Sequence, residues 1–145
     1  MMVRALSMSI EPCFNLKLRQ ATRVLTQHYD AYLRDEGITI TQFSILRTLW
    51  YLKSAPQKEL QSVLVLQQTT LTRNLKPLLR DGIIQITPSE ADGRVKLVSL
   101  TADGKTLFQR ARKKWQQAQA RLSEDLGETL SNQLLKVADS IIQLA

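Results

Sequence analysis

The sequence is poor in the residue types that form disulfides or bind metals. Among its 145 residues there are one cysteine, Cys13, and one histidine, His28. A lone cysteine excludes a disulfide within the chain, and a structural zinc site needs several thiol or imidazole ligands. Glycine is also scarce, and none of the five glycines belongs to a glycine-rich phosphate loop. No metal and no other cofactor is therefore predicted.

Long apolar runs are missing as well. No stretch approaches the roughly 18 apolar residues that a membrane-spanning helix needs. The N-terminal segment MMVRALSMSIEP has neither a long apolar core nor a small-residue cleavage site, so no targeting sequence is expected and a cytoplasmic protein is predicted. Apolar residues make up 43% of the chain and charged residues 23%, which is ordinary for a globular protein. One domain spanning residues 1–145 is predicted.

The same scarcity argues against catalysis. Cys13 and His28 lie on one predicted helix, about 22 Å apart, which is too far for a nucleophile and its base. The chain is therefore not expected to be an enzyme. Its net charge of +7 favours an anionic partner, but the surplus of lysine and arginine is spread along the sequence. The position of basic residues within an element must therefore locate the binding site.

Helical periodicity dominates both ends of the chain. Apolar residues recur at spacings of three and four over residues 12–36 and again over 102–145, with Thr101 as the predicted cap of the second helix and Gly127 as its interruption. An average period near 3.5 residues is typical of helices that pack along their length. The pattern fits a helical hairpin within one chain or a dimer seam. The dimer is favoured because residues 12–36 carry apolar residues on more than one side, and both segments are interpreted as dimerisation helices.

Residues 41–100 have the pattern of a winged helix-turn-helix. Thr41 is the predicted cap of a helix that ends before Ser54, and Ser54 is the predicted cap of a short helix that runs to about Leu64. A further helix is expected to open near Gln68 and to end at Gly82.

A β-hairpin is predicted directly after these helices. Residues 83–87 and 95–100 are rich in β-branched side chains and flank a turn that contains Asp92 and Gly93. A hairpin in this place is a wing. The predicted fold class is mainly α with a small β-hairpin wing (α+β), flanked by the N- and C-terminal dimerisation helices.

The segment LQQTTLTRNLKPLLRDGIIQ, residues 66–85, has three basic residues and no acidic residue before Asp81. On a helix its leucines fall on one side, and the opposite side holds Thr69, Thr72, Arg73, Lys76 and Arg80. A solvated face normally mixes charges of both signs, whereas these five residue types can all contact phosphates or base edges. Double-stranded DNA is the predicted partner. Pro77 should kink this helix, and a tolerated kink is favoured over a bend that fits the groove.

These motifs resemble the MarR family of bacterial transcriptional regulators, from about Phe14 to the C-terminal helix. The most specific part is DGRVKLVSLT, which fits the family pattern D-x-R, five residues, then L-T, beginning at Asp92. TTLTRNLKPLLRDGII resembles the family's recognition helix and its exit into the wing. One departure is Val65, where many members have glycine between the two helices.

The resemblance implies a homodimer whose recognition helices enter successive major grooves of a pseudo-palindrome. Arg94 would then reach the minor groove, and Asp92 would orient the wing. Lys58 is equally well explained as a solvated charge or as a phosphate contact. The complete set of predicted DNA contacts is Lys58, Gln68, Thr69, Thr72, Arg73, Lys76, Arg80, Arg94 and Lys96.

Two routes of regulation follow from the resemblance. Relatives that sense organic hydroperoxides carry a reactive cysteine followed by phenylalanine near the start of the first helix, as in Cys13-Phe14 here. The spacing of Tyr29 and Tyr32 does not match the supporting tyrosine pair, so an inert thiol is favoured over a redox sensor. The other route is a small aromatic or phenolic effector between the dimerisation helices and the winged domain, and the candidate residues are Arg19, Arg23, His28, Tyr29, Phe43, Leu46 and Trp50. For each of these, a core or solvated role is favoured.

The predicted function is a sequence-specific regulator that binds double-stranded DNA, most readily a ligand-responsive repressor. A rival from another class is a protein-interaction module that docks an acidic partner on the basic helix. DNA binding should weaken steeply with salt and should prefer one palindrome to scrambled DNA, which separates the two hypotheses.

Overall fold

The computed structural model describes residues 11–145; the prediction about a targeting sequence concerns residues 1–10 and lies outside this part. Helices and strands follow one another in this order: α1 (Phe14–Leu33), the 3-10 helix η2 (Arg34–Glu36), α2 (Ile40–Leu52), β1 (Ser54–Ala55), α3 (Gln57–Leu64), α4 (Gln68–Arg80), β2 (Ile84–Pro88), β3 (Lys96–Leu100) and α5 (Ala102–Ile142). The predicted mainly helical fold with a small hairpin is confirmed.

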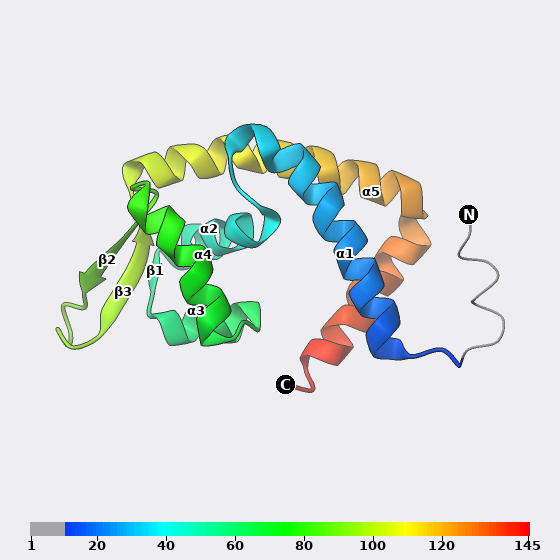
Figure 1. The fold of residues 1–145 in the computed structure, drawn as a ribbon, viewed down its shortest axis with the longest axis horizontal. Helices are drawn as coiled ribbons and strands as arrows, with labels where there is room; N and C mark the ends of the chain where they lie inside the picture. Colours follow the sequence, from blue (N-terminus) through cyan, green and yellow to red (C-terminus); the bar gives the residue numbers. More distant parts are fainter. Residues whose placement is uncertain (1–10) are drawn as a thin grey trace.

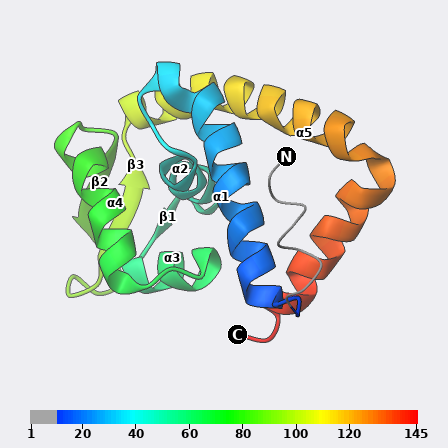
Figure 2. The same ribbon diagram turned by 45° about the vertical axis from the view of Figure 1, so that its right-hand side comes forward.

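The long helix α5 links the two sides of the molecule. It starts beside the β2–β3 hairpin, crosses above α2 and α1, and then bends back so that its last part lies beside α1 (Figure 1). Figure 2 shows α3, α4 and the sheet on one side, and α1 with the end of α5 on the other. The winged helix-turn-helix and the two terminal helices are thus joined through α5.

The sheet contains one strand more than the sequence analysis predicted. Its order is β1-β3-β2, with all strands antiparallel, and Ser54 of β1 lies opposite Ser99 of β3. The prediction that Ser54 caps α3 is wrong, because Ser54 pairs within the sheet and Pro56 is the N-cap, without a side-chain cap hydrogen bond. A two-residue strand depends on a partner more than 40 residues away in the sequence, so local patterns do not reveal it.

The start of α2 also differs from the prediction. Thr39, not Thr41, caps the helix: its hydroxyl accepts from the Gln42 amide at 3.2 Å, and the Gln42 side chain accepts from the Thr39 amide at 3.1 Å. This reciprocal capping box satisfies two backbone donors that a helix start leaves free. Asp30 of α1 accepts from the Ile40 amide at 2.7 Å, so α2 starts at a fixed point on α1.

One hydrophobic core holds α2, α3, α4, the sheet and the first half of α5 together. Phe43 of α2 stacks on Phe108 and Trp115 of α5, with ring centroids 5.5 and 5.6 Å apart. Burying an aromatic or leucine side chain contributes roughly 1.5–3 kcal/mol. The core residues of α4, Leu71, Leu75 and Leu78, are buried in the same cluster. Helix α4 is therefore anchored in the same core as α5, the helix that crosses the molecule.

Two glycines shape α5. Thr101 caps the helix as predicted, accepting from the Gly104 amide at 3.0 Å. A Cβ atom on Gly104 would lie 2.0 Å from the carbonyl oxygen of Ile83, so only glycine permits this approach of α5 to the start of the wing. Gly127 has φ 80° and ψ 165°, a conformation almost confined to glycine, and it produces the predicted interruption.

Val65 occupies the turn between α3 and α4 in a left-handed conformation, with φ 52° and ψ 47°. Its amide donates to the carbonyls of Gln61 and Ser62, which closes α3. A β-branched residue is strained there by roughly 1–2 kcal/mol. The strain accounts for glycine being the residue that suits this turn.

Replacing Val65 by glycine should raise the free energy of unfolding by about 1 kcal/mol, because relief of the backbone strain exceeds the entropy that glycine adds to the unfolded chain. Urea denaturation at one fixed protein concentration measures this. Val63→Gly is the matched control, since Val63 is exposed and lies within the helix α3. There the same change should lower stability by about 0.5 kcal/mol. A loss of stability in both variants would contradict the strain argument.

Candidate nucleic-acid interface

The predicted separation of the two sides of α4 is confirmed. Leu71, Leu75 and Leu78 are buried, and Leu79 at their edge is exposed. The predicted DNA contacts on this helix are all exposed, and they are Gln68, Thr69, Thr72, Arg73, Lys76 and Arg80. The helix continues through Pro77, whose missing amide does not end it before Arg80. A polar helix face without a carboxylate is thus open to solvent along the whole of α4.

The cations on this face differ in their surroundings. Within residues 11–145, neither Arg73 nor Lys76 forms a salt bridge, and the same holds for the exposed Lys58 in the first turn of α3. Arg80, at the end of α4, is paired with the next residue: its Nε and Nη2 donate to the two Asp81 carboxylate oxygens at 3.0 and 3.4 Å. This pair raises the pKa of Arg80 and lowers the pKa of Asp81. Arg73 and Lys76 on α4 and Lys58 on α3 are therefore unpaired in this part of the chain, whereas Arg80 is paired with Asp81.

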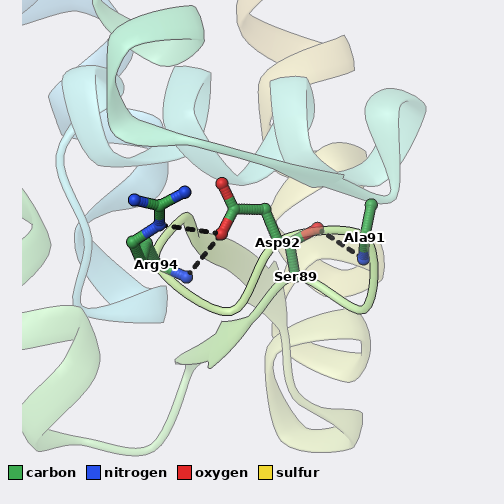
Figure 3. Close-up of polar contacts among 4 residues, drawn as sticks. All are labelled: Ser89, Ala91, Asp92 and Arg94. Atoms are coloured by element: carbon green, nitrogen blue, oxygen red, sulfur yellow. Dashed lines mark hydrogen bonds and ion pairs between the residues drawn. The ribbon is translucent and has the colours of Figure 1, made fainter.

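The wing presents Arg94 at its tip. The Asp92 carboxylate accepts from the Arg94 amide at 3.1 Å and from its Nε at 3.4 Å (Figure 3). Ser89 supports the same turn, because its hydroxyl accepts from the Ala91 amide at 3.2 Å. Arg94 nevertheless stays 94% exposed. Asp92 therefore fixes the backbone of the tip and accepts from Nε of Arg94, while the rest of the exposed guanidinium can contact a ligand.

Lys96 opens β3 and is exposed, with Pro88 at the end of β2 as its strand partner. Lys96 therefore sits at the base of the wing loop.

The residues predicted for an effector pocket lie in different surroundings. Phe43 and Leu46 are buried in the core, and Arg19 and Arg23 are exposed on α1. A cavity of about 360 Å³ between α2, the sheet and α5 is lined by Leu49, Trp50, Lys53, Gln85, Ser99, Leu100 and Lys105. Only Trp50 belongs to both sets.

His28 and Tyr29 join α1 to α5 instead. A ring nitrogen of His28 lies 2.9 Å from the Ala118 carbonyl oxygen, and the Tyr29 hydroxyl donates to the Gln119 side chain. Partial burial raises the pKa of Tyr29. Both side chains of α1 thus form contacts with α5 of the same chain.

Two features escaped the sequence analysis. The first is the ion pair between Arg80 and Asp81, which the sequence analysis did not predict. An acidic residue directly after Arg80 is a visible signal for such a pair. Lys53 and Lys105 meet at one cavity from distant parts of the sequence, and no local pattern could have paired them.

Cys13, the other regulatory candidate, is exposed at the N-cap of α1. Among residues 11–145 no cluster of histidine, cysteine and carboxylate side chains could hold a metal ion. A search of the same residues finds no helix with the length and apolarity needed to cross a membrane.

Comparison with known proteins places this geometry in a family. The sequence model described as "MarR family" matches residues 38–96. The organic hydroperoxide resistance transcriptional regulator of Bacillus subtilis (strain 168) is 34% identical over 104 residues, which cover 72% of this chain and 71% of the relative. The multiple antibiotic resistance protein MarR of Salmonella typhimurium is 34% identical over 113 residues, covering 78% of this chain and 72% of that protein.

Solved structures agree with the sequence relatives. The M. tuberculosis transcriptional regulator MosR, in complex with DNA, has a TM-score of 0.77 and 32% identity, covering 90% of this chain and 96% of that one. The transcriptional repressor CouR, bound to a 23-mer DNA duplex, has a TM-score of 0.81 and 25% identity, with coverages of 89% and 92%. With the winged helix-turn-helix, the Asp92–Arg94 wing and relatives of this similarity, the chain belongs to the MarR family of transcriptional regulators.

Proposed function

We propose that this protein is a homodimeric repressor that binds a pseudo-palindromic DNA site in the cytoplasm. The observation that carries the proposal is the exposed face of α4, where Arg73 and Lys76 have no acidic partner within residues 11–145. Two structural relatives were crystallised with DNA, and one of them is described as a repressor. An enzyme is not proposed, because the relatives are transcriptional regulators.

The shapes of the elements suit the two DNA grooves. A major groove about 12 Å wide admits one α-helix, so α4 can enter it with its threonines, Arg73 and Lys76 toward base edges and phosphates. Arg94 at the wing tip then reaches the adjoining minor groove, which attracts arginine when it is narrow. Lys58 and Lys96 lie on the flanking elements, where phosphate contacts would fix the register.

Arg94→Ala should weaken binding to the operator by about tenfold, since each protomer loses one groove contact. Fluorescence anisotropy measures this with the DNA upstream of the protein's own gene, at near-physiological and at higher salt. The wild type should prefer this DNA to a scrambled fragment and should weaken steeply with salt. Arg121→Ala is the control, because Arg121 lies on α5 and pairs with Asp125.

Two results would count against this assignment. Unchanged operator affinity of Arg94→Ala would remove the wing from the interface. Equal, weak binding of the wild type to both fragments would favour the rival in which the basic helix docks an acidic protein.

A second copy of the chain is the proposed occupant of the apolar surface on the terminal helices. Within the chain α1 already packs on α5, and yet large apolar side chains on both helices stay exposed. The exposed ones are Phe14, Leu16, Leu18, Val24, Leu130, Leu134, Leu135, Val137, Ile141 and Ile142, and Leu144 follows the end of α5. Four of them, Val24, Leu130, Leu134 and Val137, line an apolar groove of about 580 Å³ between α1 and α5. An exposed apolar area of this extent is typical of a protein interface.

Leu134→Asp should convert the dimer into monomers, because the substitution places a carboxylate in the apolar groove. Sedimentation equilibrium measures the molecular mass of the variant. Its affinity for the operator should also fall, because a monomer contacts only one half-site. Leu52→Asp is the matched control: Leu52 is 40% exposed, against 38% for Leu134, but lies on α2 away from the groove. The proposal fails when Leu134→Asp keeps the mass of the wild type.

Ligand response would act through the dimer. An effector between the dimerisation helices and the winged domain releases DNA only when it binds one dimer shape more tightly than the other. Of the predicted pocket residues, Trp50 lines a cavity next to the sheet, and Arg19 and Arg23 are accessible on α1. A small aromatic or phenolic effector remains the proposed class.

Redox sensing through Cys13 is the second candidate. The exposed position of Cys13 and the similarity to an organic hydroperoxide resistance regulator favour it. Against it, Tyr29 lies 16 residues further along the same helix, about 24 Å away, and its hydroxyl is bound to Gln119. Within one chain this tyrosine cannot support the thiol.

Cys13→Ser should therefore behave like the wild type when an organic hydroperoxide is added to the protein–operator complex. Anisotropy before and after treatment, with reversal by a thiol reductant, measures the response. Release of the wild type combined with retention of Cys13→Ser on DNA would establish the redox sensor and overturn the prediction.

A further inference from the structure

The arginines at the two ends of the proposed interface are each held by a nearby aspartate. Arg94 of the wing is held by Asp92, and Arg80 at the end of α4 by Asp81. Arg73 and Lys76, earlier on α4, have no such partner within residues 11–145. Asp92 has a second role in the wing turn, because it also accepts from a backbone amide. The only side-chain hydrogen bonds of Asp81 in the described chain are with Arg80.

Asp81 occupies an unfavourable place for a carboxylate. It is the C-cap of α4, where the last carbonyl groups of the helix carry partial negative charge. Between Glu59 and Asp81 the sequence has no acidic residue, so Asp81 is the first carboxylate that follows the basic face of α4 along the chain. Glu36 and Asp103 line one pocket with the Arg80–Asp81 pair, but among residues 11–145 neither forms a salt bridge with Arg80. It is exposed and contributes nothing to the core. The folding of the domain therefore gives no reason for a carboxylate at this position.

The geometry of the pair leaves Arg80 able to bind DNA while it is paired. Asp81 takes the Nε hydrogen and one hydrogen of Nη2. A guanidinium has five N–H donors, so those of Nη1 and the second of Nη2 stay available on its outer edge. A two-point contact also fixes the plane of the guanidinium, which a single contact would leave free to rotate. The available donors thus point in a defined direction.

We infer that Asp81 is a specificity-determining residue that positions Arg80 and offsets its charge. The inference rests on the proposed DNA-binding function. On DNA of unrelated sequence, a phosphate gains little from Arg80, because the neighbouring carboxylate repels it. On the operator, a DNA acceptor atom that lies in the plane of the guanidinium can bind to donors that are already oriented. Arg80 then strengthens the operator complex more than the non-specific one.

The test compares Asp81→Asn with Asp125→Asn. Asp125 forms the corresponding pair with Arg121 on α5, with an Nε–Oδ2 distance of 3.2 Å against 3.0 Å for Arg80 and Asp81. The side chains are similarly exposed, 63% and 56% for Arg121 and Asp125 against 72% and 57% for Arg80 and Asp81. Both variants remove one negative charge per chain and free one arginine. A general effect of net charge therefore appears equally in both.

Anisotropy with operator and scrambled duplexes over a range of salt concentrations supplies two readouts. For Asp81→Asn, the affinity for scrambled DNA should rise about tenfold and the affinity for the operator by less, so that the specificity ratio falls about three- to tenfold. The salt dependence on scrambled DNA should steepen by about one phosphate contact per protomer. Asp125→Asn should leave the ratio unchanged. An unchanged ratio in Asp81→Asn as well would overturn the inference.

A second background shows whether Asp81 acts through Arg80. In Arg80→Gln, the further change Asp81→Asn should raise the affinity for both duplexes equally and leave their ratio unchanged. A fall in the ratio in this background too would mean that Asp81 does not act through Arg80. A failure of the proposed function is distinct from both results, because then the wild type itself would show no preference for the operator.

Discussion

The close approach of α5 to the start of the wing is the constraint on which the arrangement of the molecule depends. Gly104 leaves no room for a side chain next to the Ile83 carbonyl, and the Thr101 hydroxyl donates to the Gly82 carbonyl at 2.5 Å. The wing and the first turns of α5 are therefore one rigid unit. Because α5 continues to the proposed dimer surface, a change in the angle between two protomers must move the wing as well.

The aromatic stack on α5 extends this coupling to the recognition helix. Phe108 and Trp115 hold Phe43 of α2, and the leucines of α4 are buried in the same cluster. A packed core has few alternative arrangements, so the winged unit moves as a whole when α5 moves. The bend at Gly127 then sets where the end of α5 lies beside α1. In the proposed dimer, the spacing between the two copies of α4 would thus depend on contacts far from the DNA, and an effector that changes the spacing would act at those contacts.

Much of this could be predicted from the sequence, because it depends on local chemistry. The two sides of α4, the Thr101 cap and the interruption at Gly127 follow from periodicity, a hydroxyl cap and a glycine. The errors have one physical origin. Thr39 caps α2 because Gln42 and Asp30 support that start, and Ser54 belongs to a strand because β3 passes beside it. Phe43 and Leu46 are buried in the core, which agrees with the role that the sequence analysis favoured over a place in an effector pocket.

The basic surface contains two kinds of cation, those with and those without an acidic partner. The unpaired Arg73 and Lys76 lie in the middle of α4, where in the proposed complex they would attract any duplex and supply affinity that depends on salt. Arg80 at the end of α4 and Arg94 on the wing each have a neighbouring carboxylate that offsets their charge and accepts from their Nε. Such arginines add little to a complex in the wrong register, because the carboxylate competes with a misplaced phosphate. A surface that combines unpaired and paired cations could therefore bind DNA in general and still favour one register on one sequence.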